Sequence, residues 1–168
     1  MTAPFTWLDV VDGQRSDTDA VNALGNAVEA LAAEPAWSGW TPVWTATGGG
    51  ASIGDGSLIG TYRKVGRLVA MFLRLNWGST TAGGTGRWRF TVPFDPSPAN
   101  VYVGGFAYDS SAVLAYPVAS KWGNSAPHIE LVGAHNSAGA IGNCAATHPF
   151  TWATGDSLVL QGVYESIS

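Results

Sequence analysis

Composition and sequence pattern together predict a mainly β fold for this 168-residue chain. Glycine supplies 22 residues, tryptophan supplies 8, and charged residues make up only 12%, which is typical of a turn-rich, sheet-based protein. From residue 40 onward, short apolar stretches alternate with turn residues, without a helical pattern between them. Strands that follow one another in this way form antiparallel sheets. We therefore expect an antiparallel β-sandwich or jelly-roll head, preceded by a short N-terminal arm and one oligomerising α-helix.

The arm comprises residues 1–15. Phe5, Trp7 and Leu8 stand there among few polar groups, in a segment too short to form a core and too apolar to be left in water. We interpret these three residues as an anchor that binds a partner protein. An arm that packs on its own domain is the alternative.

An oligomerisation helix is expected within residues 16–36. Ser16 can cap it, with Asp19 three residues later, and Pro35 ends it. Apolar residues recur at the spacing of a coiled-coil seam, at Val21, Leu24, Val28 and Leu31. Homo-oligomerisation through this seam is our first interpretation, and packing of the helix on the sheet is the alternative. Valine and leucine at these positions favour a dimer by the rules for isolated peptides.

The head comprises residues 37–168, and its predicted strands are separated by turn sequences such as Asp55-Gly56 and Gly155-Asp156. Within residues 67–77, both alternating sets of side chains are largely apolar, so one face should line the core and the other a neighbouring subunit. The expected strands are Thr41–Thr47, Leu58–Lys64, Arg67–Trp77, Gly86–Val92, Val101–Ala107, Ala112–Ala119, His128–Val132 and Ser157–Tyr164.

Most tryptophans are expected in the core, where large aromatic side chains pack best. Trp37, Trp40 and Trp44 lie between the helix and the predicted sheet, and we expect them to fix the head on the helical stalk. Trp122, in the segment Lys121-Trp-Gly-Asn-Ser125, is expected to be exposed.

The stretch 40–75 resembles a known family. Trp40-Thr-Pro-Val-Trp44 leads into glycine-spaced hairpins over residues 54–66, and similar pieces recur at 88–93 and 152–165. This pattern is similar to the β-rich domain that ends many small fibre, spike and decoration proteins of tailed bacteriophages. The motifs are turn and strand patterns, so the resemblance implies a fold and a role in adhesion and assembly.

The resemblance implies a non-enzymatic structural protein on the surface of a phage virion. We expect a homotrimeric capsid decoration or head-fibre protein, because related spikes are usually trimers and a tail fibre usually needs a longer shaft. Its partners would be the major capsid protein or a tail protein, bound through the arm. The alternative is a tail fibre or receptor-binding module that recognises host surface glycans, with Trp122 and Asn124 as candidate ligand-binding residues.

Catalytic interpretations find little support. Gly50-Ala-Ser-Ile-Gly54 matches the nucleophile elbow of α/β-hydrolases, but a hairpin turn follows Ser52 where a helix is required. A glycosidase needs two facing carboxylates, and Glu130 alone among the acidic residues of the head falls on a predicted strand. We expect no catalytic residues and no enzyme activity.

Cofactors, metals, nucleic acid and membranes are not expected either. Cys144 and the three histidines, His128, His135 and His148, lack the short paired spacing of a structural zinc site. The net charge of −4 opposes binding to nucleic acid, so we interpret the arginines and lysine of residues 63–89 as partners in ion pairs between subunits. The chain contains no run of about 18 apolar residues, so the sequence predicts no membrane span.

Overall fold

The computed structural model describes residues 18–32, 36–97, 102–121, 128–133 and 141–167. The chain divides into two compact units, residues 1–34 and 35–168. Unit 1 contributes helix α1 (Thr18–Ala32), which lies inside the range predicted from the capping residues and Pro35. The only described helix, α1, is too short and too polar to cross a bilayer.

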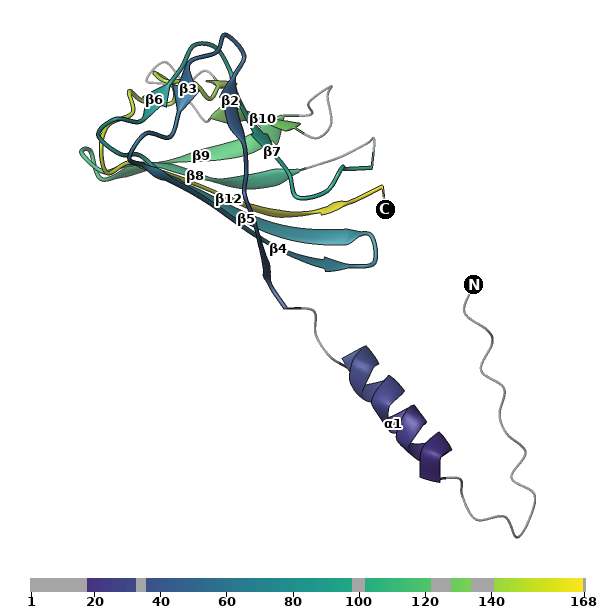
Figure 1. Cartoon of the computed structure of the whole chain (residues 1–168). Helices are drawn as coiled ribbons and strands as arrows, with labels where there is room; N and C mark the ends of the chain where they lie inside the picture. Colours follow the sequence, from purple (N-terminus) through teal and green to yellow (C-terminus); the bar gives the residue numbers. More distant parts are fainter. Residues whose placement is uncertain (1–17, 33–35, 98–101, 122–127, 134–140, 168) are drawn as a thin grey trace. The chain divides into compact units, whose positions relative to one another are not determined.

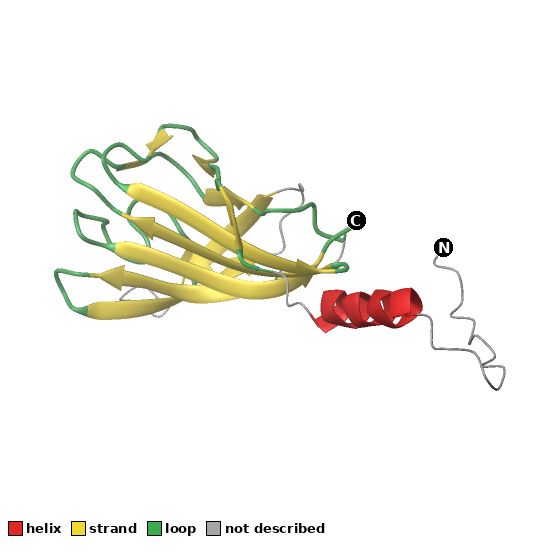
Figure 2. Cartoon of the chain, turned by 60° about the horizontal axis from the view of Figure 1, so that its bottom comes forward, coloured by secondary structure: helices red, strands yellow, loops and turns green. Residues whose placement is uncertain are grey.

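Unit 2 is an antiparallel β structure, as predicted (Figures 1 and 2). Its strands are β1 (Ser38–Trp40), β2 (Trp44–Ala46), β3 (Ala51–Ser52), β4 (Ser57–Val65), β5 (Leu68–Asn76), β6 (Ala82–Gly83), β7 (Trp88–Thr91), β8 (Val103–Asp109), β9 (Leu114–Lys121), β10 (His128–Gly133), β11 (Gly142–Asn143) and β12 (Ser157–Glu165).

One large sheet has the strand order β1-β4-β5-β12-β8-β9-β10-β7-β2 and curls into a half-barrel around the core (Figure 2). The small strand β11 pairs with β10, and β3 and β6 form a separate two-stranded sheet. The hairpin β4–β5 is joined through Gly66, whose φ of +58° suits a tight hairpin turn. Strand β12, near the end of the chain, pairs with β5 along its whole length.

The first strand differs from its prediction. A single strand was expected over 41–47, whereas the chain forms β1 against β4 and β2 against β7, at opposite edges of the sheet. Pro42 lies between the two and has no N–H to donate to a continuous ladder. The segment 38–46 therefore supplies both edges, which brings the ends of the curled sheet together.

The core is rich in tryptophan. Trp77 stacks on Trp88 and Trp152 with ring centroids 5.8 and 5.5 Å away, and Trp44 meets Trp88 edge-on at 4.9 Å. The Trp88 indole N–H donates to the Gly83 carbonyl at 2.8 Å. The expectation that Trp44 serves the stalk junction is wrong, because strand alternation turns its side chain into the core.

The two neighbours of Trp44 behave differently. Trp40 is partly buried against the core, with its ring over Gly60 of β4. Trp37 is exposed. The three tryptophans therefore do not form one functional group.

Candidate functional site

The predicted coiled-coil seam lies on the surface of α1. Val21, Leu24 and Val28 keep 58%, 49% and 55% of their surface exposed. Their spacing places them on one side of the helix. Leu31 belongs to α1, but its side chain lies outside the part of the chain that the structure describes. An apolar stripe in water is a candidate contact for a second molecule.

A second apolar surface lies on the side of the large sheet that faces away from the core. We call the outward-pointing residues of β4, β5, β12 and β8 the outer face. On β5, Val69 and Leu73 are fully buried, whereas the alternate residues Leu68 and Arg74 are exposed. The outer face is therefore separate from the core, although both are apolar.

Strand register aligns the residues of the outer face in rows. One row crosses the sheet from β4 through β5, β12 and β8 to the neighbouring β9: Ile59, Arg74, Val159, Phe106 and Pro117. The next row is Thr61, Phe72, Gln161, Gly104 and Ala119. A third row follows on β4, β5 and β12: Arg63, Ala70 and Val163.

Large apolar side chains on this face are open to water. Ile59, Phe106 and Val163 keep 52%, 56% and 52% of their surface exposed. Val65 and Leu68 at the β4–β5 turn, and Tyr102 just before β8, are also exposed. Sequence analysis anticipated this surface only on β5, since the period-2 pattern of one strand does not reveal which strands lie beside it.

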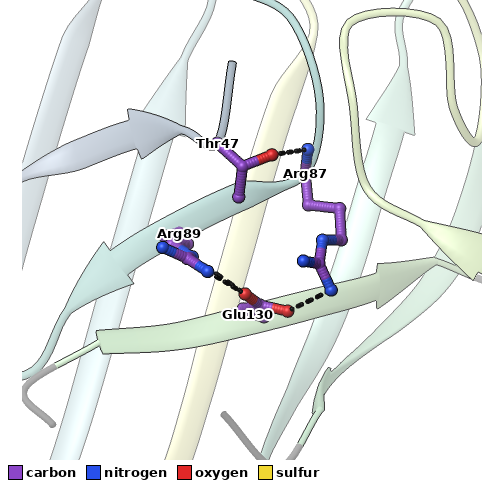
Figure 3. Close-up of polar contacts among 4 residues, drawn as sticks. All are labelled: Thr47, Arg87, Arg89 and Glu130. Carbon is purple, nitrogen blue, oxygen red and sulfur yellow. Dashed lines mark hydrogen bonds and ion pairs between the residues drawn. The ribbon is translucent and has the colours of Figure 1, made fainter. Parts of the chain in front are cut away.

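The other half of the same sheet is charged on its outward side, around Glu130 of β10 (Figure 3). Arg89 donates from Nε and Nη2 to Glu130 Oε1 at 2.8 and 2.6 Å, and Arg87 Nη1 lies 3.0 Å from Oε2. The Glu130 side chain is only 10% exposed. Antiparallel register puts Arg89 directly opposite Glu130.

These arginines correct one interpretation from the sequence. Arg87 and Arg89 form ion pairs within the chain, and so does Arg67, whose Nη1 lies 3.2 Å from Glu165 Oε1. The prediction that this basic group pairs between subunits is wrong for these three residues. Sequence spacing could not show that Glu130 and Glu165 would be their strand neighbours.

Two aspartates in loops, Asp55 and Asp156, connect separate segments of the chain through hydrogen bonds. Asp55 accepts hydrogen bonds from the Ser79 hydroxyl at 2.7 Å and from the Thr80 N–H at 2.7 Å. These bonds, with Ser79 the largest cause, hold the pKa of Asp55 well below its usual value of 3.8. Asp156 is buried and accepts from Ser110 and from the Ala153 N–H. Each carboxylate thus joins two segments of backbone.

The residues considered for catalysis do not form a site in the described part of the chain. Ser52 ends β3 and is followed by a turn. Cys144 is fully buried, and burial raises the pKa of its thiol to about 12. Within the described ranges, no three His, Cys, Asp or Glu side chains are placed to hold a metal ion. His135 lies outside those ranges.

Two groups of predicted site residues also lie outside the described residues. They are the anchor, Phe5, Trp7 and Leu8, and the candidate ligand-binding pair, Trp122 and Asn124. Their assignments remain predictions.

Comparison with known proteins gives one informative similarity. The chain is 32% identical over 132 residues to the Mu-like prophage FluMu defective tail fiber protein of Haemophilus influenzae. The alignment covers 76% of this chain but 20% of the relative, so the chain spans about a fifth of the length of the curated protein it matches. No family model and no solved structure matches. Over most of its length, the chain is therefore similar to part of a phage tail fibre protein.

Proposed function

We propose that this chain is a non-enzymatic structural component of a phage tail. The similarity to a tail fibre protein carries this proposal. Two apolar surfaces, the stripe of α1 and the outer face, suit a protein that works by assembly. Between the capsid and tail positions expected from the sequence, the relative's name favours the tail.

Assembly would begin at the helix. Val21, Leu24, Val28 and Leu31 would form the seam of a homotrimer, in which each stripe is buried against its neighbours. A helix of 15 residues is marginal by itself, so the attached head domains would help to hold the chains together.

Attachment to the particle would use the arms. Phe5, Trp7 and Leu8 of each copy would bind a larger tail protein. Several arms joined by one trimer bind far more tightly than one arm alone, provided that all of them reach their sites.

Immunogold electron microscopy of particles of the phage that encodes the chain tests the location. We expect gold on the tail. Gold on the capsid would restore the decoration interpretation, and particles without gold would contradict a role as a virion component.

Recognition of host glycans is the second candidate function, because an exposed indole stacks on the face of a sugar ring and Trp122 stands in the polar segment 121–125. Trp122 and Asn124 would contact the sugar. Trp122→Ala should abolish binding to host cells, whereas the exposed Trp37 provides a matched control, Trp37→Ala. Unchanged binding by Trp122→Ala would exclude this loop.

A further inference from the structure

We propose that the outer face is the surface on which the head domains of separate copies pack against one another. This contact is distinct from the helical seam and uses residues of β4, β5, β12 and β8. The contact is tested on the purified chain, so the result does not depend on where the protein lies in the particle.

The exposed area is large enough for such a contact. Large side chains that are about half exposed make up much of the face, and an aromatic one of this kind presents on the order of 100 Å². Ile59, Phe106 and Val163 belong to this class, as do Val65, Leu68, Tyr102 and Tyr108. The three aromatic residues alone therefore present on the order of 300 Å². The four aliphatic residues extend this surface towards the roughly 800 Å² that each partner contributes to a standard interface. Apolar patches above a few hundred Å² on a protein surface mark interaction sites.

The positions of the charged residues are compatible with burial of the outer face in a contact between copies. The row through Thr61, Phe72 and Gln161 carries no charged side chain. Arg74 and Arg63 stand in the rows on either side of it, and their long side chains can reach the edge of a contact while their stems remain buried. Glu165, at the end of the face, pairs with Arg67. A largely uncharged centre with charges around it is the usual anatomy of a protein interface.

A second copy fits this face better than a charged partner does. The other half of the sheet holds the paired charges of Arg87, Arg89 and Glu130. On the outer face, the uncharged row through Phe72 separates Arg63 from Arg74, so the two arginines do not form one continuous charged patch. Large and small residues alternate along its strands: Phe106 is followed on the same face of β8 by Gly104, and Phe72 on β5 by Ala70. Facing sheets interdigitate in this way at a spacing of about 10 Å.

Cysteine cross-linking of the full-length chain tests the proposal. Gln161 is exposed at the centre of the face, and Gln161→Cys places a thiol there. Thr45→Cys is the matched control, because Thr45 is also an exposed polar residue in a strand, but on the charged half of the sheet. The native Cys144 is fully buried and does not compete for the reagent. Far-UV circular dichroism checks that both variants fold.

We expect a short bismaleimide to convert the Gln161→Cys variant into covalent dimers on a denaturing gel, and to give few dimers with Thr45→Cys. A monofunctional maleimide should label position 161 about tenfold more slowly than position 45, since interface cores exclude water. Equal labelling without dimers would overturn the proposal, because the face would then be open. Slow labelling without any dimer would also overturn it, because the chain itself would then cover the face.

Discussion

At the scale of single residues, charge is placed where strand register provides a partner. Glu130 is an acid in a sheet, a position that usually disfavours carboxylates. It is tolerated because Arg87 and Arg89 together satisfy both of its oxygens. The two arginines remain partly open to water, which reduces the cost of burying the charges.

Neutralising Glu130 should destabilise the head domain. In Glu130→Gln, the charge-assisted hydrogen bonds to both arginines weaken, and we expect the free energy of unfolding in urea to fall by about 2 kcal/mol. Glu165→Gln is the control, because the Arg67–Glu165 pair is exposed and should contribute less than about 1 kcal/mol. Equal losses in the two variants would contradict a special role for the Glu130 cluster.

Asp55 should make the domain sensitive to acid. Its pKa is lowered in the folded state, so its contribution is complete above the unfolded pKa of about 4 and is lost as the pH falls towards the folded pKa. Asp55→Asn should therefore melt at a lower temperature than the wild type at pH 7. The gap should narrow steadily below about pH 4. Melting curves from pH 2 to 7 measure it, and a gap independent of pH would refute the role of the carboxylate charge.

At the scale of elements, the long hairpin β4–β5 and strand β12 follow their sequence signals closely. Alternating apolar residues and turn dipeptides predicted them within a few residues. The short strands β3, β6 and β11 had no such signal. Two residues are too few for a pattern of period 2. The strand β11 forms against the longer β10, whereas β3 and β6 pair with each other, and no local pattern reveals either pairing.

The edge strand β1 depends on a glycine opposite it. A Cβ atom at Gly60 would overlap the Trp40 ring that covers it. We expect Gly60→Ala to lower the free energy of unfolding by about 1–3 kcal/mol, as other overpacked sites do. Gly39→Ala is the control, since the atom nearest to a Cβ at position 39 would be the Gly60 carbonyl oxygen, 4.0 Å away. A neutral Gly60→Ala would mean that Trp40 does not pack tightly there.

The helix is predicted to decide the number of chains in the assembly. Leu24→Asp combined with Val28→Asp puts two charges into the apolar stripe, and we expect the mass measured by light scattering to fall below that of the wild type, for which we propose a trimer. Asn22→Asp, at another exposed position of α1, should leave the mass unchanged. A wild-type monomer would rule out the seam.

At the scale of the whole molecule, distant parts of the chain stabilise one another. β12 lies between β5 and β8, and the Ser166 N–H donates to the Arg67 carbonyl at 2.8 Å, so the end of the chain secures an early hairpin. Segment 38–46 joins both edges of the sheet. Because of this long-range pairing, we expect unit 2 to unfold as one cooperative unit.

Association should therefore add to the stability of the molecule. If copies meet through the helix and the outer face, the melting temperature rises with protein concentration, because assembly favours the folded state by mass action. Calorimetry over a hundredfold range of concentration, roughly the range that separates weak from saturated association, measures this shift. A constant melting temperature and a monomeric mass together would contradict self-association.

Local patterns in the sequence were sufficient to predict the fold class, the helix and the long strands. Each of these features depends on period-2 or period-3.6 spacing and on turn residues, which involve only neighbouring positions in the chain. The same patterns showed that β5 is apolar on both sides. Tertiary structure alone decided that Trp44 enters the core, that Arg87 and Arg89 meet Glu130, and that Ile59, Val163 and Phe106 share one exposed face. These outcomes depend on which strands become neighbours, and pairing across the chain is set by the free energy of the whole sheet.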